Sequence, residues 1–535
     1  MATVRNEPQS FNRLAAPPDS TAILVSHTLT QAPLVRINPL SDDVEPWLAA
    51  SWSRGADGRT YILALRQDVT YSDGHPFTSA DVLFTFRALY DPSLGSTLAD
   101  SMKVDGQPLA VAAPDDHTVV ITFPVLYGPG VRILAPLPIL PRHKLEAALE
   151  AGTFPSAWGM GTTGSDFAGL GPFVPAGYEP GQRVRLARNP RYWRTAPTGA
   201  SLPYLDGITL EVVPNQDAEL LRLEAGESDA TASAIRPADY APLRRAADAG
   251  RVQLFDLGVG LTADSLWFNL RPGAFAGDPR AAWIQRDELR QAISLAVDRP
   301  AFADQVYFGA AVPVFGFVTP ANAKWYLDTT PEVPLDLDAA RARLAAIGLT
   351  DRDGDGQIED AAGRAARFTL LVQRGRTDVE RGADFLRGEL RKLGLTMDVA
   401  ALEPNVLIQR FVSGRDYDAV LFSVEATDTD PAGNLDFWRS SGAAHVWNMN
   451  QSEPATDWER RIDDLMAAQV TSEDDAERQR LFDEVQTVMA EHLPVLNFAA
   501  PRVYVAASAR LRDLQPAISR PQLLWAADSI AIAVE

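Results

Sequence analysis

The sharpest local pattern of apolar and polar residues lies at 71–92, which reads YSDGHPFTSADVLFTFRALYDP. Val82 and Phe86 recur at helical spacing within this segment, which predicts a short amphipathic helix. Thr78, followed three residues later by Asp81, resembles a capping box and predicts where that helix begins. The preceding residues, RTYILALRQDVT, are rich in apolar and β-favouring side chains. The pattern therefore predicts a strand, a tight turn and a capped helix.

Beyond about residue 258 the pattern alternates between strands and helices. Period-two or continuous apolar runs predict strands, and runs with helical spacing predict helices. The expected strands are RFTLLVQRG (367–375), LTMDVAAL (395–402), DYDAVLFSV (416–424) and segments within PVLNFAAPRVYVA (494–506), and the expected helices are 286–297, 378–394, 457–470 and 473–492. Alternation of this kind is typical of an α/β domain with parallel strands.

Composition narrows the class of protein. The 535 residues suffice for about three domains, and 46% hydrophobic with 22% charged residues is ordinary for a globular chain. No run approaches the roughly 18 apolar residues of a membrane span. The net charge of −21 argues against electrostatic binding to nucleic acid or anionic lipid.

The absence of cysteine excludes disulfides, thiolate metal sites and a cysteine nucleophile. It also weakly favours an exported protein. The start, MATVRNEPQSFNRL, has no apolar signal-peptide core. We therefore expect either a cytosolic protein or a mature exported chain with a replacement methionine.

Motifs for enzyme chemistry are scarce. The chain has no GxSxG elbow, Walker loop or HExxH sequence. Its six histidines show no metal-ligand spacing, and carboxylate pairs on so acidic a chain are more typical of solvated surface than of a glycosidase. Gly159, Gly161 and Gly164 form a GxGxxG pattern without the strand and helix that dinucleotide binding needs. We expect no cofactor.

One segment resembles a metal site. In DRDGDGQIED, the residues Asp351, Asp353 and Asp355 occupy the first alternating ligand positions of a calcium loop. The twelfth position, which should carry a bidentate glutamate, is Ala362, and a strand rather than a helix follows. The segment therefore predicts an Asp/Gly-rich hairpin more than a calcium site, and we expect no bound metal.

Charged and aromatic side chains follow several predicted strands. Ligands of open α/β sheets bind beyond the carboxyl ends of the strands. The candidates at such ends, or in the HVWNMN segment expected to converge with them, are Arg374, Arg376, Glu425, Asp428, Asp430, Trp447 and Asn448. Each residue alone is more typical of surface charge or core packing, so the prediction rests on the group.

Several segments, taken in order, resemble one known family. TYILALRQDVTYSDGHPFTSADVLFTFRALYDP resembles the signature region of the family 5 solute-binding proteins of bacterial ABC importers, which bind oligopeptides, dipeptides or nickel chelates. GLGPFVPAGYEPGQRVRLARNPRYW, LRQAISLAVDRPAFADQVYFGAAVPVFGFVTPAN and LPVLNFAAPRVYVA resemble later blocks of that family. DRDGDGQ resembles a recurrent hairpin of the family, which further lowers the expectation of calcium.

The resemblance implies an α/β fold, the two-lobe periplasmic binding protein fold of type II, large cluster, with hinge strands between the lobes and an extra subdomain in the first lobe. The first lobe would comprise 1–43, 168–255 and 497–535, with 44–167 as the inserted subdomain, and 256–496 would form the second lobe. The protein would be a monomer that closes on its ligand and delivers it to an ABC permease. Its place would be periplasmic or extracellular, associated with the membrane.

The resemblance also suggests a ligand class. In peptide-binding members, an aspartate four residues before the proline of the segment resembling TDTDP holds the peptide ammonium. That place is Thr427 here, and Asp428 lies one position later. We expect Asp428, or Glu425 in its stead, to hold an ammonium, Arg374 to meet a carboxylate, and Trp447 with Asn448 to complete the site.

This departure leaves an oligosaccharide, an opine-like compound or a nickel chelate as alternatives. His445, the one histidine in a candidate loop, argues against a multi-histidine nickel site. An extracellular hydrolase is a further alternative, and so is a sensor that presents its ligand to a chemoreceptor.

Overall fold

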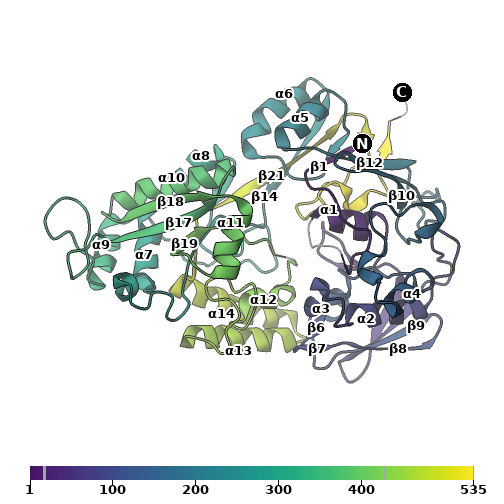
Figure 1. Ribbon diagram of the computed structural model, residues 1–535, viewed down its shortest axis with the longest axis horizontal. Helices are drawn as coiled ribbons and strands as arrows, with labels where there is room; N and C mark the ends of the chain where they lie inside the picture. Colours follow the sequence, from purple (N-terminus) through teal and green to yellow (C-terminus); the bar gives the residue numbers. More distant parts are fainter. Residues whose placement is uncertain (16–19, 427, 534–535) are drawn as a thin grey trace. The chain divides into compact units, whose positions relative to one another are not determined.

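The structure is a computed structural model that describes residues 1–15, 20–426 and 428–533 (Figure 1). The chain divides into two compact units, the first formed by 1–257 with the segment from Tyr504 onward and the second by Gly258–Val503. It passes between them inside β14 (Val252–Val259) and again inside β21 (Ala499–Ser508). No helix among the described residues combines the length and apolar character that crossing a bilayer requires.

The first unit is built on a mixed sheet. Its strand order is β10-β11-β12-β1-β13-β21-β14, with β1 (Ala2–Val4) parallel to both of its neighbours. The other strands and the helices packed with them are β10 (Phe173–Glu179), β11 (Arg183–Arg188), β12 (Gly207–Val212), β13 (Ala230–Thr231), α5 (Gln216–Glu224) and α6 (Tyr240–Asp248). Short α1 (Ser20–Ile23) continues directly into a π-helix, η1 (Leu24–Leu29).

A second, antiparallel sheet of the first unit carries the helix that the sequence predicted. The order is β4 (Ala49–Arg54), β5 (Thr60–Leu65), β9 (Thr118–Thr122) and β8 (Ala110–Asp115). Helix α2 (Ser79–Leu89) packs on this sheet and beside α4 (Arg142–Glu150). The Asp81 carboxylate accepts the Thr78 N–H at 3.0 Å, so the predicted capping interaction is confirmed.

The second unit has a five-stranded sheet, ordered β18-β17-β19-β15-β20. Its strands are β18 (Thr396–Leu402), β17 (Arg367–Gln373), β19 (Ala419–Leu421), β15 (Ser265–Phe268) and β20 (Val495–Asn497). β17 is parallel to both of its neighbours, and β15 is antiparallel to both of its own. The α/β alternation predicted for this half is confirmed.

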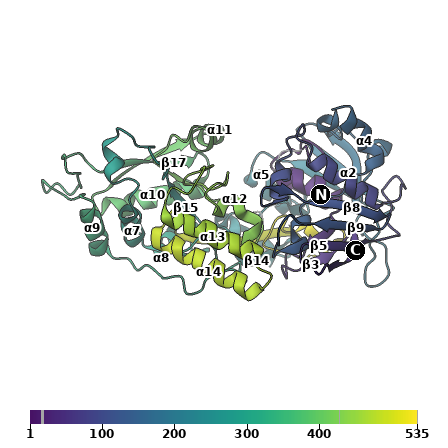
Figure 2. The same cartoon turned by 90° about the horizontal axis from the view of Figure 1, so that it is seen from below.

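Helices cover both faces of this sheet (Figures 1 and 2). On β15, Leu266 and Phe268 enter one hydrophobic core and Trp267 enters the other, because successive strand residues face opposite sides. The first core is closed by α7 (Asp287–Ala296), α8 (Arg299–Tyr307), α9 (Leu337–Ala346) and α10 (Thr377–Arg391), and the second by α11 (Pro404–Ile408), α12 (Leu435–Trp438), α13 (Asp457–Thr471) and α14 (Asp475–His492).

Candidate functional site

The carboxyl ends of β17, β18 and β19 meet at one edge of the second unit's sheet, because these three strands are parallel. Arg374 directly follows β17 and Glu403 directly follows β18. Arg374 Nη1 donates to Glu403 Oε1 at 3.2 Å, and its Nη2 donates to the backbone oxygen of Ala401 at 3.0 Å. Both charged side chains are exposed. The arginine predicted to meet a ligand carboxylate is therefore already beside a carboxylate of the protein.

The loop after β19 carries the predicted acidic residues. Glu425 is exposed and Asp428 is half-buried, while Thr427 lies outside the described residues. Asp428 Oδ1 accepts the backbone N–H of Asp430 at 3.1 Å, and the backbone oxygen of Asp428 accepts from Asn434 Nδ2 at 2.8 Å. These bonds fold the loop into a turn that fixes where the Asp428 carboxylate lies.

A glycine is required beside that carboxylate. A Cβ atom added to Gly433 would lie 2.6 Å from the Cβ of Asp428. This distance is shorter than a van der Waals contact, so any larger residue would displace the loop. The position of Asp428 thus depends on the absence of a side chain five residues later.

A buried ion pair anchors the same loop. Asp430 Oδ1 accepts from Arg478 Nη2 of α14 at 2.6 Å and also caps the short 3₁₀ helix η8 (Pro431–Asn434) through Ala432 N at 2.9 Å. The Arg478 guanidinium lies 5.0 Å from the centre of the Trp325 ring. Sequence reasoning missed Arg478, although one signal was present, since Arg478, Leu481 and Val485 share a helix face with helical spacing and a charge there needs a partner.

Trp447 and Asn448 lie inside the second unit rather than at its surface. Trp447 is 1% exposed, stacks on Trp267 with ring centroids 6.1 Å apart, and donates from Nε1 to Glu459 Oε1 at 3.1 Å. Asn448 is also buried, and its backbone N–H donates to the oxygen of His445 at 2.9 Å. The expected apolar wall therefore belongs to the core in this structure.

A further acidic residue lies at the start of β15, which reaches the same sheet edge because this strand is antiparallel to β19. Asp264 is buried, and burial raises its pKa to about 7 although the Tyr307 hydroxyl donates to Oδ1 at 2.7 Å. Its Oδ2 has no hydrogen-bond partner among the described residues. This edge thus includes a carboxyl group whose charge changes near neutral pH.

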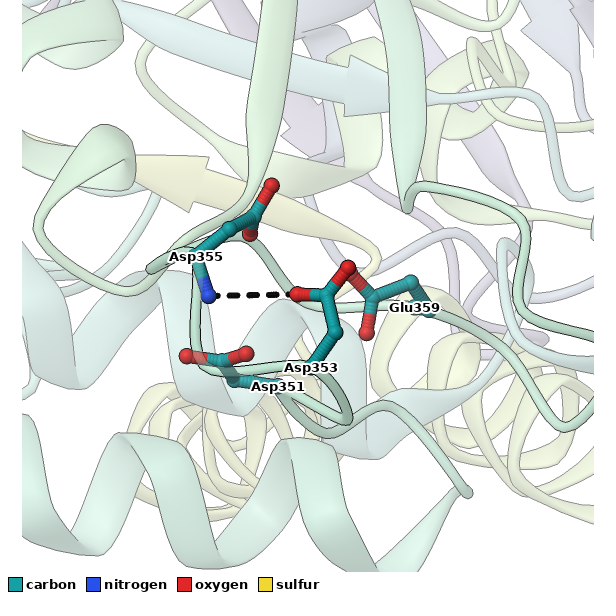
Figure 3. Close-up of side chains that lie close together, drawn as sticks. All are labelled: Asp351, Asp353, Asp355 and Glu359. Atoms are coloured by element: carbon teal, nitrogen blue, oxygen red, sulfur yellow. Dashed lines mark hydrogen bonds between the residues drawn. The ribbon is translucent and has the colours of Figure 1, made fainter.

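The three aspartates of the calcium-like segment come together with a fourth carboxylate (Figure 3). One oxygen from each of Asp351, Asp353, Asp355 and Glu359 lies within 4.8 Å of the others. Glu359, the ninth residue of the segment, is buried and was missed because the pattern asks for glutamate at the twelfth position. It is the residue that could join the aspartates around a cation.

Backbone N–H groups already use several of these oxygens. The Asp351 carboxylate accepts from Gly354 N at 2.7 Å and from Gly356 N at 3.0 Å, and Asp353 accepts from Asp355 N at 3.1 Å. Glu359 Oε2 accepts from Arg352 N at 2.9 Å. These bonds are those expected of a self-supporting Asp-rich turn.

Comparison with known proteins settles the family. The family model of the bacterial extracellular solute-binding proteins, family 5, matches residues 43–445, well over half of the chain. The chain belongs to this family. The resemblance drawn from the sequence is therefore confirmed, and the protein is a non-enzymatic solute-binding protein of an ABC transporter, from a family that is extracellular or periplasmic.

Individual relatives differ in what they bind. A probable ABC transporter-binding protein of Deinococcus radiodurans is 25% identical over 92% of this chain and 85% of its own, and a periplasmic alpha-galactoside-binding protein of Rhizobium meliloti is 24% identical over 93% and 75%. The oligopeptide-binding protein AppA of Bacillus subtilis, solved with a nonapeptide, aligns over 100% of this chain and 98% of its own, with a TM-score of 0.77 and 22% identity. The two-lobe periplasmic binding protein fold is thus confirmed.

Proposed function

We propose that the protein captures a peptide-like solute as a monomer and hands it to the membrane permease of an ABC importer, working in association with the membrane. The observation that carries the proposal is the loop after β19, where an anchored turn holds the Asp428 carboxylate half-exposed. An ammonium group needs an anionic partner once water is excluded, because an unpaired buried charge is costly.

Glu425 is the second acidic group of this loop and completes the proposed ammonium site. Arg374 can meet a solute carboxylate only by sharing or leaving Glu403, since the two side chains are paired at 3.2 Å. Trp447 and Asn448 support the site from the core. The fold likeness to a nonapeptide-binding protein is consistent with a peptide, whereas the galactoside-binding relative makes a neutral sugar the rival solute.

Two variants test the proposal. Asp428→Asn keeps an acceptor for the Asp430 N–H while removing the negative charge, so it separates loss of charge from loss of the turn. Calorimetry with a library of di- and tripeptides should find at least one that binds, and Asp428→Asn should weaken that peptide by well over tenfold. Asp351→Asn, in the remote acidic segment, is the matched control and should bind like wild type.

Mass spectrometry of solute released from the denatured wild-type protein gives an independent answer. A released peptide, or a peptide that raises the melting temperature, supports the proposal. Release of a neutral sugar, together with wild-type binding by Asp428→Asn, would overturn the peptide assignment in favour of an oligosaccharide.

A further inference from the structure

Asp264, in the second unit, is a buried carboxyl group of which only one oxygen is used by the surrounding protein. The residue is 4% exposed, and its Oδ2 atom has no hydrogen-bond partner among the described residues. Its Oδ1 atom accepts from the Tyr307 hydroxyl of α8 at 2.7 Å. An ionised carboxylate buried with an unpaired oxygen is costly, so the charge and the proton of this group compete.

The backbone of Asp264 is held by bonds that do not involve its carboxyl group. Its N–H donates to the backbone oxygen of Ala499 at 3.0 Å, and its backbone oxygen accepts from Asn497 Nδ2 at 3.1 Å. Asn497 lies in β20, which pairs with β15, and its Nδ2 also donates to Ser265 Oγ at 2.9 Å. These bonds hold Asp264 in the same place whether or not its carboxyl group is charged.

An arginine and a second carboxylate lie close enough for their charges to act on Asp264. Arg376 is in the loop that joins β17 to α10, and Asp378 is in the first turn of α10, which packs against α8. Arg376 donates from Nε to Asp378 Oδ1 at 3.1 Å and from Nη2 to Asp378 Oδ2 at 2.8 Å. Two carboxyl groups are thus within reach of the charge of one guanidinium.

The three groups that face Asp264 act on its pKa in opposite directions. Burial raises this pKa to about 7 and the negative charge of Asp378 adds to the rise, whereas the hydrogen bond from Tyr307 and the positive charge of Arg376 oppose it. Burial alone would raise the pKa of Asp378, but the hydrogen bonds and charge of Arg376 lower it. Near pH 7, therefore, Asp264 changes its charge while Asp378 stays ionised.

Arg376 can respond to that change because its side chain is 53% exposed and lies in a loop. A guanidinium carries five N–H donors, and the bonds to Asp378 come from two of its nitrogens. The loop follows β17 at the sheet edge where the loop after β19 carries Asp428, since these two strands are parallel neighbours. A movement of Arg376 would therefore occur beside the proposed solute site.

We propose that Asp264 is a proton-operated switch for the loop between β17 and α10. With its proton, Asp264 leaves Arg376 paired with Asp378, and without it Asp264 draws Arg376 toward Oδ2. The opposite charge then offsets the cost of burying an anion. The inference rests on the proposed function in one respect, since it makes the affinity of the solute held at Asp428 depend on pH.

The switch can be measured without a solute. In protein labelled with ¹⁵N-arginine, the Arg376 Nε–Hε signal is assigned by its loss in Arg376→Lys, and in protein labelled with ¹³C-aspartate the Asp264 carboxyl signal is assigned by its loss in Asp264→Asn. Both signals should move between pH 5.5 and 8.5 with one midpoint near 7. An Arg376 signal that stays fixed, or that moves equally in Asp264→Asn, would overturn the proposal.

Two neighbouring variants should move that midpoint in opposite directions. Tyr307→Phe removes a donor that favours the charged form of Asp264, so the midpoint should rise by about one pH unit. Asp378→Asn removes a negative charge and releases Arg376, so the midpoint should fall by about one pH unit. These variants keep the proposal testable if Asp264→Asn does not fold, and shifts of the same sign would contradict it.

Arg367, at the start of β17, supplies the matched control. It forms a two-bond pair with Asp398, with Nη2 donating to Asp398 Oδ1 at 2.8 Å, and hydrogen bonds from Arg367 lower the pKa of Asp398. Because this partner stays ionised at neutral pH, the Arg367 Nε–Hε signal should show no midpoint near 7. A midpoint shared by Arg367 and Arg376 would indicate a general effect of pH and would overturn the assignment to Asp264.

The solute gives the second test. A peptide found by calorimetry should bind wild type and Asp264→Asn equally at pH 6, where Asp264 carries its proton, and at least about fivefold differently at pH 8. Comparing the two proteins at one pH cancels the titration of the peptide's own amine. By linkage, saturating peptide should also shift the midpoint of the Arg376 signal.

The outcomes separate this inference from the proposed function. Equal binding by wild type and Asp264→Asn at pH 8, with Asp428→Asn impaired, would overturn this inference alone. Titration of Arg376 together with Asp264 in a protein that binds and releases no peptide would instead contradict the proposed function.

Discussion

Two buried charged side chains, one in each unit, differ in whether the surrounding residues give them hydrogen-bond partners. Glu459 of α13 is 2% exposed, and its Oε1 accepts from Trp447 Nε1 at 3.1 Å and from Gln451 Nε2 at 2.9 Å. Its Oε2 accepts from the N–H and hydroxyl of Thr456 at 3.0 and 3.1 Å. Arg13 is almost as deeply buried and has no such partner among the described residues. The contrast separates a charge that the fold pairs with several donors from one that the described residues leave without an acceptor at Nε and Nη1.

The pKa values express the same difference. Burial alone would raise the pKa of Glu459, but hydrogen bonds from His445, Gln451 and Trp447 overcome it and lower the pKa to about 2. For Arg13, burial lowers the pKa, and no group among the described residues compensates. The folded state therefore stabilises the charge of Glu459 and destabilises that of Arg13.

The largest expected effect is the loss of Glu459. Glu459→Ala removes the acceptor that Trp447, Gln451 and Thr456 share, and it leaves their donors buried and unpaired. Breaking a buried network of this kind typically costs about 3–5 kcal/mol of unfolding free energy. Urea denaturation of the variant should show this loss.

Asp457→Ala is the control for that experiment. Asp457 lies on the same helix but is fully exposed, and its contact with Arg460 is a surface pair. The urea midpoint should stay at the wild-type value. A Glu459→Ala midpoint equal to that of Asp457→Ala would mean that Glu459 is no more structural than a surface charge.

A pH titration should separate the two buried regions. The pKa of His27 in the folded protein, about 4, lies below its ordinary value of 6.5, so the unfolded chain binds the proton first. The stability associated with neutral His27 is complete above pH 6.5 and is lost as pH falls toward 4, by about 3 kcal/mol in total. Glu459, lowered from 4.5 to about 2, loses its contribution only below pH 4.5.

Asp264, whose pKa burial raises to about 7, contributes in the opposite direction over the same pH range, so the measurement is made in an Asp264→Asn background, where the unfolding free energy between pH 7.5 and pH 3 should fall in two stages. His27→Gln should remove the upper stage and leave the lower one. Arg13→Met should raise the pKa of His27, since the charge of Arg13 contributes to lowering it, and the upper stage should shrink. An upper stage that Arg13→Met leaves unaltered would show that Arg13 and His27 do not interact.

Local patterns explain which elements could be predicted. Helix α2 was found because its cap and its apolar spacing lie within a dozen residues. The strand predicted at 416–424 is shorter in the structure, Ala419–Leu421, because the backbone oxygen of Phe422 accepts a hydrogen bond from Trp267 Nε1 at 2.6 Å. That contact joins residues 155 positions apart, which no local pattern reports.

The residues of the candidate sites likewise differ in whether the local sequence could predict their positions. Asp428 could be named from its place after a strand, but the anchor of its loop, Arg478, is 48 residues from Asp430. Trp447 was predicted in the site because the HVWNMN segment was expected to converge with the strand ends, whereas contacts with Trp267 and Glu459 bury it. The burial of Arg13 could not be predicted from the local sequence, since the chain just before it is held by hydrogen bonds of Phe11 to Trp158 and of Asn12 to Phe154, which are far along the chain.

A smaller effect, of opposite sign, is expected at Arg13. Arg13→Met replaces an unpaired buried charge with an apolar side chain of similar length. Such replacements are neutral or stabilising even for paired charges, so the unfolding free energy in the absence of solute should rise by about 1 kcal/mol or more. Thermal and urea denaturation of solute-free protein are the measurements.

Arg132→Met serves as the counterpart, because it breaks a buried pair with Asp42 and should destabilise. Destabilisation of both variants to the same extent would contradict the comparison, since Arg13 would then have a structural partner.

The smallest effect on stability is expected for the aspartates of the 351–355 segment, whose charges are exposed to solvent and accept hydrogen bonds from the backbone. Asp351, Asp353 and Asp355 are exposed, and backbone N–H groups donate to each of them, so neither a counter-ion nor burial is needed to keep three carboxylates close together. Asp351→Asn should leave the urea midpoint unchanged, and calorimetric titration of chelator-treated protein should show no micromolar calcium binding, because the bidentate ligand at the twelfth position is absent.

Glu359 is the residue whose substitution tests whether the group binds calcium, since it is the one buried member of the group. Micromolar calcium binding that Glu359→Gln abolishes would contradict this prediction, and it would place a third kind of buried charge in the molecule, one partnered by a metal.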